Sequence, residues 1–267
     1  MSKLKVLYVA SEIRPFLENS SVGSFLQSLP KYMCENGIDV RIVVPRFGVI
    51  GVRKNKIHEV VRLSGMSILV GNQKVRIIVR SSSIPEAKLH VYFIDSEEYF
   101  ERKFVFHDED DIFFEDNAER IIFFCKGVLE TVKRLEWAPD IIHCHDWVSS
   151  LIPVYLKTLY VNDSILRNSR SVFTLYNNVF RDKLNSTFIE KLNISNKDIL
   201  DSLASVDFKA LISTALMCSD MAFKTEVLSD ELFNGIDNLN NVVTIEHTND
   251  GIKEYHSIYN NLKFKSH

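Results

Sequence analysis

The sequence predicts a doubly wound α/β fold with a mostly parallel central sheet. Three observations support this prediction. Short, almost continuously apolar runs alternate with amphipathic helical patterns along most of the 267 residues, as in sheets that helices cover on both faces. The first strand, helix and strand follow one another within about 40 residues, the length of one βαβ unit. Apolar residues make up 46% of the chain, which is enough for a large buried core.

The first βαβ unit has the clearest local pattern. Residues 5–10 form a short, almost continuous apolar run and predict a buried parallel strand. Between Val22 and Met33, apolar residues recur at spacings of three and four, which predicts a helix with one buried face that Gly37 ends. Residues 40–44 predict the second strand, joined to the first by a right-handed crossover.

The middle of the chain changes to short alternating segments, residues 67–70, 75–79 and 89–94. Gly71-Asn72 between the first two is a hairpin signal, and residues 81–85 separate the second from the third. These segments predict a β-hairpin insertion on the α/β core. The acidic run at 108–116 is typical of a solvated loop or helix lead-in rather than a cation site.

The second half of the chain returns to alternating elements. We expect helices at 117–135, 147–159, 207–217 and 229–233, and strands at 140–143, 171–175, 221–223 and 242–245. Residues after 245 are mostly polar, and we expect a poorly ordered tail. The predicted organisation is one domain, residues 1–245, followed by a polar tail, residues 246–267.

Composition and charge argue against several classes of protein. The net charge of −3 and the absence of basic runs argue against a nucleic-acid binder. The four cysteines form no C-x-x-C pair and are typical of buried thiols in a reducing compartment. The apolar amino-terminal run is too short for a signal peptide, and no stretch approaches the roughly 18 uncharged apolar residues of a membrane span. We therefore expect a cytoplasmic protein that binds neither nucleic acid nor membrane.

Polar residues follow three predicted strands, where doubly wound sheets bind their ligands. They are residues 11–15 with the loop up to Gly23, residues 143–147 and residues 176–178. In the second group, H-C-H-D-W, His143 and His145 point to one side of the strand and Asp146 is placed to cap the next helix. No third ligand for a metal is evident. A cap with two partly buried histidines is the alternative to a binding site.

Five segments together resemble one enzyme family. They are K-V-L-Y-V-A-S-E-I-R-P-F at 5–16, L-P-K-Y-M-C-E-N-G-I-D-V-R-I-V-V-P-R-F-G at 29–48, D-N-A-E-R-I-I-F-F-C-K-G-V-L-E at 116–130, P-D-I-I-H-C-H-D-W-V-S-S-L-I-P-V-Y-L-K at 139–157 and V-F-T-L-Y-N-N at 172–178. In order and approximate spacing they resemble bacterial glycogen synthases and plant starch synthases.

The resemblance implies the amino-terminal, Rossmann-like half of a GT-B glycosyltransferase, with the second GT-B domain absent. Members of that family transfer glucose from ADP-glucose to the non-reducing end of an α-1,4-glucan and retain the anomeric configuration. The implied partners are α-1,4-glucan, ADP-glucose and a separate chain that supplies the carboxyl-terminal GT-B domain. No metal and no cofactor are implied.

Two positions depart from the family pattern. Residues 18–24 read E-N-S-S-V-G-S where the family has K-[ST]-G-G-L-x-D, so Glu18 reverses the charge of a lysine. One charge contact at about 4 Å is worth roughly 4 kcal/mol at an effective dielectric of about 20, so donor binding is expected to weaken unless Glu18 turns away. Tyr176 replaces a histidine, and a phenol does not carry a proton near neutral pH as imidazole does.

Two functions remain open at this stage. The first is a glucosyltransferase that depends on a partner chain, and the alternative is a non-catalytic module that binds α-glucan or a synthase. A generic dinucleotide-binding domain is disfavoured because no G-x-G-x-x-G follows the first strand. For the glucosyltransferase the resemblance implies a catalytic set, Asp146, His145 and Tyr176, and a substrate-binding set, Glu12, Ser20, Ser21, Gly23, His143, Trp147 and Asn177.

Overall fold

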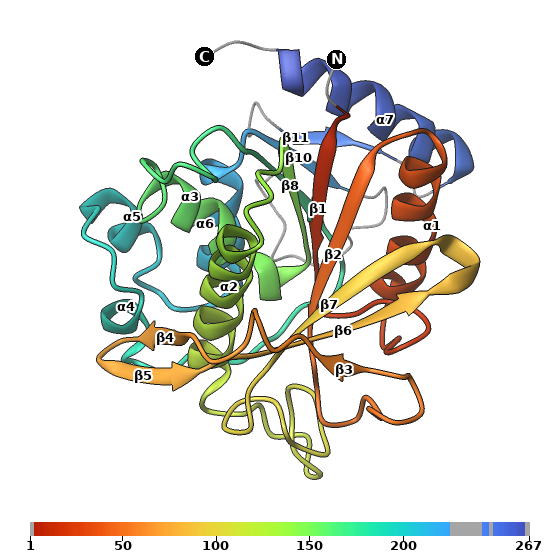
Figure 1. Cartoon of the computed structure of the whole chain (residues 1–267). Coiled ribbons are helices and arrows are strands. Elements are labelled where there is room, and N and C mark those ends of the chain that lie inside the picture. Colours follow the sequence, from red (N-terminus) through yellow and green to blue (C-terminus); the bar gives the residue numbers. More distant parts are fainter. Residues whose placement is uncertain (1–2, 225–241, 246–247, 265–267) are drawn as a thin grey trace.

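A computed structural model describes residues 3–224, 242–245 and 248–264 of the chain (Figure 1). The strands are β1 (Lys5–Val9), β2 (Asp39–Pro45), β3 (His58–Glu59), β4 (Ser67–Val70), β5 (Gln73–Arg76), β6 (Ile78–Ile84), β7 (Leu89–Asp95), β8 (Ile141–His145), β9 (Arg170–Leu175), β10 (Met221–Lys224) and β11 (Val242–Thr244). The helices are α1 (Ser21–Glu35), α2 (Asn117–Arg134), α3 (Leu151–Lys157), α4 (Phe188–Lys191), α5 (Lys197–Ser202), α6 (Phe208–Cys218) and α7 (Asn249–Phe264), with 3-10 turns η1 (Pro85–Ala87) and η2 (Trp147–Ser149).

The main sheet confirms the predicted doubly wound topology. Its strand order is β11-β10-β9-β8-β1-β2-β7-β6-β3, with β1 paired in parallel to both β2 and β8. The chain winds outward through β2 and β7, then returns to the other side of β1 and continues through β8, β9, β10 and β11. The winding therefore reverses between β1 and β8, the place where such sheets bind ligands.

Local sequence signals explain the first βαβ unit. The apolar residues of β1 are buried because helices cover both faces of the sheet. Ser20 caps α1 through its side chain, which accepts a hydrogen bond from Val22 N at 3.2 Å. Gly37 takes the left-handed conformation, φ +84°, and Ile38 N then donates to Met33 O at 3.1 Å, which ends the helix as predicted.

The predicted hairpin insertion is partly confirmed. Strands β4 and β5 form a separate two-stranded sheet around Gly71-Asn72. The predicted strand 75–79 is wrong, because its residues divide between β5 and β6, and most of the predicted separator 81–85 lies within β6. Strand β7 is no excursion either, since it joins the main sheet in parallel to β2. That pairing joins segments far apart in the sequence, so local alternation did not reveal it.

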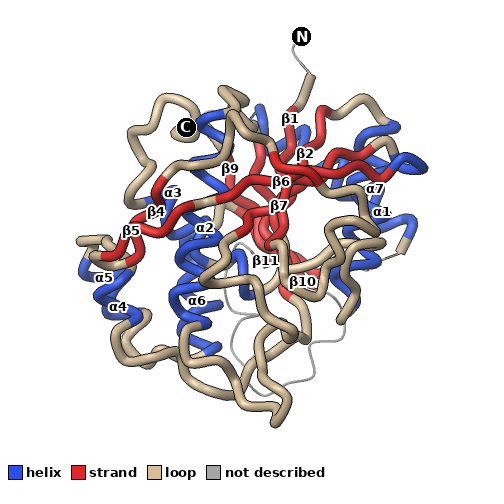
Figure 2. Tube along the Cα trace, turned by 60° about the horizontal axis from the view of Figure 1, so that its bottom comes forward, coloured by secondary structure: helices blue, strands red, loops and turns tan. Residues whose placement is uncertain are grey.

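Helices cover both faces of the sheet (Figures 1 and 2). Helices α2, α3 and α6 lie on one side of it, with the β4–β5 sheet beside α2. Helices α1 and α7 lie together on the other side.

The predicted helix 147–159 is divided into the turn η2 and the helix α3, and β8 extends to His145, two residues beyond the predicted end. No described helix is long and apolar enough to cross a membrane.

The carboxyl-terminal tail is not as expected. Residues 249–264 form α7, whereas a poorly ordered polar tail was predicted, and the predicted helix 229–233 lies outside the described residues. Four apolar residues at spacings of three, four and three, all buried, account for the helix: Ile252, Tyr255, Tyr259 and Leu262. This spacing forms one helical stripe, which the surrounding polar residues obscure in the sequence.

Candidate functional site

A cavity of about 190 Å³ opens at the carboxyl ends of β1, β2, β8 and β9, beside the loop 101–116. This is the predicted edge of the sheet. The described residues that line it are Ser11, Glu12, Leu17, Asn19, Ser20, Phe47, Val105, Phe106, His107, Phe113, Trp147, Asn178, Val179 and Phe180.

Aromatic rings form most of the apolar part of the cavity. The ring of Trp147 lies 4.7 Å from that of Phe106 and 4.9 Å from that of Phe180, centroid to centroid. Phe113 stacks on Phe180 at 5.3 Å with an interplanar angle of 16°. The loop 101–116 and the loop after β9 therefore meet across Trp147, and their rings give the cavity its shape.

The polar end of the cavity is built around Glu12. Its carboxylate accepts hydrogen bonds from Asn19 N at 2.5 Å, Ser20 N at 2.9 Å, Ser20 Oγ at 2.6 Å and Gly23 N at 3.2 Å. Gly23 lies in the first turn of α1, where the N–H groups have no partner within the helix, Ser20 is the N-cap of that helix and Asn19 precedes the cap. Ser20 lines the cavity, Gly23 reaches it only through Glu12, and the Ser21 side chain is exposed and does not line it.

Glu18 does not face the cavity. Its carboxylate forms an ion pair with the Arg14 guanidinium four residues earlier in the same loop, and both side chains are partly exposed. The charge reversal noted in the sequence is therefore directed away from the site. The negative charge that the cavity does meet belongs to Glu12, which is only 3% exposed.

Asp146 joins the ends of β1 and β8. One carboxylate oxygen accepts from Ser11 N at 3.0 Å and Ser11 Oγ at 2.5 Å, and the other accepts from Val148 N at 2.8 Å, which confirms the predicted cap. Its backbone has φ +63°, which places this side chain back over the strand end. Burial raises the pKa of Asp146 to about 7, against the Ser11 and Val148 hydrogen bonds that lower it, and Glu12 adds to the rise.

This pKa gives a testable pH dependence. Asp146 binds its proton more tightly in the folded chain than in the unfolded chain. Between about pH 4 and pH 7 the unfolded chain releases this proton while the folded chain keeps it, so the free energy of unfolding falls as the pH rises. We expect its contribution to lower the free energy of unfolding by about 2 kcal/mol from pH 5 to pH 7. The measurement is urea unfolding of wild type and Asp146→Asn at pH 5, 6, 7 and 8. Parallel pH profiles of the two proteins would contradict it.

His143 and His145 point to the same side of β8, as predicted, with ring centroids 3.9 Å apart. Neither lines the cavity. Both are fully buried on the face covered by α1 and α7. His143 shares hydrogen bonds with the Tyr259 hydroxyl through Nδ1 and with Thr174 Oγ1 at 2.6 Å through Nε2. Their contacts match the structural alternative, partly buried histidines beside a cap, more closely than a cavity wall.

The segment after β9 contributes a different asparagine from the one predicted. Tyr176 is buried and shares a hydrogen bond of 2.8 Å with His145 Nδ1, away from the cavity. Asn177 is exposed and does not line the cavity, whereas Asn178 does. Asn178 Oδ1 is buried and accepts no hydrogen bond from the described part of the chain.

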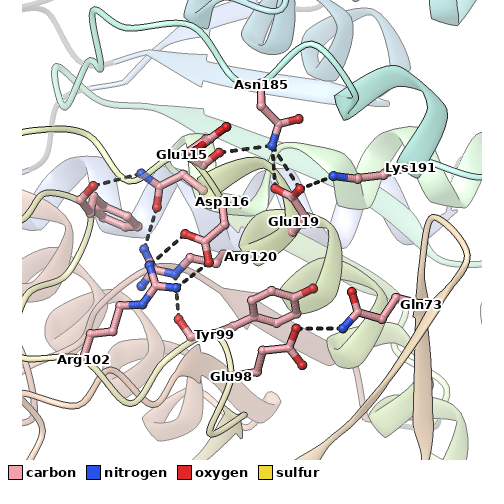
Figure 3. A network of polar contacts seen from close by, with 12 residues as sticks. Gln73, Glu98, Tyr99, Arg102, Glu115, Asp116, Glu119, Arg120, Asn185 and Lys191 are labelled. Atoms are coloured by element: carbon pink, nitrogen blue, oxygen red, sulfur yellow. Dashed lines mark hydrogen bonds and ion pairs between the residues drawn. The ribbon is translucent and has the colours of Figure 1, made fainter.

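The start of α2, the D-N-A-E-R segment, carries a network of polar contacts (Figure 3). None of its residues lines the cavity. Asn117 Nδ2 donates to Phe106 O at 2.9 Å, and Arg102 pairs with Asp116 through two hydrogen bonds of 2.7 and 2.5 Å, which fixes the loop 101–116. On the other side, Glu119 accepts from Asn185 Nδ2 at 2.7 Å and pairs with the Lys191 ammonium. The motif therefore ties the loop that carries Phe106 and Phe113 to the segment after Phe180.

Sequence reasoning missed most of the aromatic lining. Two segments of the loop 101–116 are rich in aromatic residues, F-V-F-H at 104–107 and I-F-F at 112–114, and they could have indicated this lining. The sequence analysis considered only the acidic residues of this loop. No three His, Cys, Asp or Glu side chains among the described residues gather as a metal site requires.

The sequence is similar to those of known starch and glycogen synthases. A sequence model of the starch synthase catalytic domain matches residues 5–240. Glycogen synthase of Chlorobium limicola is 40% identical over 176 residues, which cover 65% of this chain and 36% of that protein. Glycogen synthase of Pelodictyon phaeoclathratiforme is 33% identical over 240 residues, which cover 85% of this chain and 48% of that protein. The chain thus spans less than half the length of these curated relatives.

A solved structure shares the fold. The catalytic domain of starch synthase IV from Arabidopsis thaliana, bound to ADP and acarbose, superposes with a TM-score of 0.75 at 17% sequence identity. The likeness covers 92% of this chain and 52% of that one. At this identity it establishes a common GT-B-type fold and does not assign ligands to this chain.

Proposed function

The chain belongs to the family of starch synthase catalytic domains, and on that premise we propose that it carries the α-glucan side of a glucosyltransferase site. The observation that carries the proposal is the cavity at the carboxyl ends of the central strands. It combines apolar rings with a polar end formed by Glu12, Ser20 and Asn178. Sugars present both a C–H face that stacks on rings and hydroxyl groups that need hydrogen-bond partners.

Some of the site residues are proposed to contact the sugar, and others to hold those residues in place. Trp147 would stack against a glucosyl ring, and Asn178, which lines the cavity, would form a hydrogen bond with a sugar hydroxyl. Asp146 would act as a positioning residue, because its carboxylate is already bonded to Ser11 and Val148 and holds Trp147 at the strand end. His145 and Tyr176 would act on a ligand only if their buried hydrogen bond opened.

We propose further that glucosyl transfer needs a donor-holding part outside these 267 residues. The matched segments cover 36% and 48% of the two glycogen synthases, and the plant enzyme was solved with ADP as well as acarbose. The expected result is no incorporation of labelled glucose from ADP-glucose into glycogen by this chain alone. Incorporation above the no-protein blank, absent from an Asp146→Ala protein, would contradict the dependence on another part.

The glucan site has a direct test. We expect maltoheptaose to bind the wild-type chain in isothermal titration, and Trp147→Ala to weaken binding by about thirtyfold or more, since a buried aromatic contact is worth about 2 kcal/mol. Trp137→Ala is the matched control, because Trp137 is equally buried but bonds Asp39 and does not line the cavity. Absence of heat with wild type, or equal weakening by both variants, would refute the site.

A further inference from the structure

We propose that the chain pairs with a second copy of itself through two oppositely charged segments at the carboxyl edge of the sheet. The basic segment is residues 53–62, and the acidic tip is residues 108–112. In a two-fold dimer the basic segment of each copy contacts the acidic tip of the other. No residue of either segment lines the cavity, so the inference does not rest on the proposed glucan site.

The two segments follow adjacent parallel strands. The chain from β2 runs into the basic segment, and the chain from β7, which pairs in parallel with β2, runs into the loop 101–116 that carries the acidic tip. Gly48 N donates to Phe100 O at 2.7 Å, and a Cβ added to Gly48 would collide with Arg102 O, so the two loops touch near their bases. Both loops lie at the lower end of the sheet in Figure 1. Because the segments share one edge, a single two-fold axis can bring each of them to its opposite in the other copy.

Each segment presents mainly one sign of charge to solvent. The basic segment has one carboxylate, Glu59, and four exposed cations, which are Arg53, Lys54, Lys56 and Arg62. The acidic tip has four carboxylates in succession, residues 108–111, and no cation. Within the part of the chain that the structure describes, none of these charged side chains forms an ion pair. Opposite charges across an interface steer association and fix its register, and here one chain supplies both signs.

Both segments are held in shape by their own chain. In the basic segment, Asn55 Nδ2 donates to Gly51 O at 2.9 Å, and Ser82 Oγ donates to Asn55 O at 2.8 Å. In the acidic tip, Asp108 Oδ1 accepts from Asp110 N at 3.0 Å and from Ile112 N at 2.9 Å. A surface that is already ordered loses little conformational freedom when it binds.

The two most exposed large apolar side chains of the described residues lie one in each segment. Val61 is 79% exposed in the basic segment, and Ile112 is 61% exposed in the acidic tip. Protein interfaces commonly bury apolar side chains within a polar, charged rim. Exposed ion pairs alone are weak and are screened by salt, whereas burial of Val61 and Ile112 adds a contribution that does not depend on charge. Charge and apolar exposure thus favour the same pair of segments.

Sedimentation velocity at about 50 mM and about 500 mM salt tests the pairing. Wild type is expected to dimerise at low salt, and the association constant should fall at least about tenfold at high salt because the charges are screened. Two variants each reverse one segment, Arg53→Glu with Lys54→Glu and Glu109→Lys with Asp110→Lys, all at exposed positions. Each reversal places like charges opposite one another and should weaken the dimer at least about tenfold.

The decisive protein carries both reversals in one chain. It restores opposite charges across the interface with the signs exchanged, so it should dimerise again. An equal mixture of the two singly reversed variants should associate for the same reason. Lys31→Glu with Lys209→Glu is the matched control, because it makes the same change of net charge at exposed positions on α1 and α6 and should leave the dimer unchanged.

Three outcomes would overturn the inference. A wild-type chain that stays monomeric at low salt would leave a different protein as the occupant of these segments. A dimer that neither reversal weakens would use another surface, and so would one that the combined reversal does not restore. If the combined variant fails to fold by circular dichroism, the mixture of the two singly reversed variants decides the same question. Maltoheptaose titration tests the glucan site separately, so failure of either proposal is distinguishable from failure of the other.

Discussion

Replacing Arg120 with alanine is expected to lower the free energy of unfolding by about 3–5 kcal/mol. Arg120 is 2% exposed, and its guanidinium donates to Tyr99 O at 2.8 Å and to Asn117 Oδ1 at 2.5 Å and packs against several phenylalanine rings. Burial lowers the pKa of Arg120 to about 9, so it stays charged at neutral pH. The substitution leaves buried acceptors unpaired and opens a void, and these costs add.

The same substitution should also weaken the glucan site. The Arg120 guanidinium carbon lies 5.5 Å from the Phe47 ring and 5.8 Å from the Phe106 ring, and both rings line the cavity. Arg120 also bonds Asn117, which holds the Phe106 carbonyl. We therefore expect a fall in maltoheptaose affinity at temperatures where the variant is still folded. This would identify Arg120 as a positioning residue that acts through the two rings.

Urea unfolding followed by circular dichroism measures the loss of stability. Arg134→Ala is the matched control, since Arg134 lies on the same helix but is exposed, and its Nε donates to Arg62 O at 2.7 Å on the surface. It should change stability by less than about 1 kcal/mol. Arg120→Lys keeps the charge without the planar fork and should recover only part of the loss. A loss below about 1 kcal/mol for Arg120→Ala would show that Arg120 does not hold this region.

The elements that local chemistry specifies were predictable. Strand β1 and helix α1 follow from an apolar run, periodic spacing and the glycine at 37, all of which act within a few residues. The cap formed by Asp146 was predictable for the same reason. Each of these features needs no knowledge of what packs against it.

The features that depend on distant partners were not predictable from local signals. Period-two geometry placed His143 and His145 on one side of β8, but only the packing of α7 decides that this side is closed. Likewise, the choice of Asn178 over Asn177 depends on how the chain turns after β9. The aromatic lining comes from loops whose acidic residues dominate their sequence pattern. Tertiary contacts, rather than residue type, select the residues of the site.

The second large effect is expected from α7. Tyr259→Ala should lower the free energy of unfolding by about 3–5 kcal/mol, since the side chain is fully buried and its loss leaves a void beside Tyr8 and Tyr255. It also removes the hydroxyl that bonds His143 Nδ1, whereas Tyr259→Phe removes that hydroxyl alone and should cost about 1–2 kcal/mol.

Ser257→Ala provides the control for this helix. Ser257 lies on the exposed side of α7, so its substitution should change stability by no more than about 0.5 kcal/mol. Urea unfolding of the three variants therefore yields a graded series if α7 packs on the sheet. Equal stability of Tyr259→Ala and Ser257→Ala would instead indicate that residues 249–264 contribute no core. In that case the face of β8 that carries His143 and His145 would be open to ligands, and the original assignment of those histidines to a sugar site would regain its physical basis.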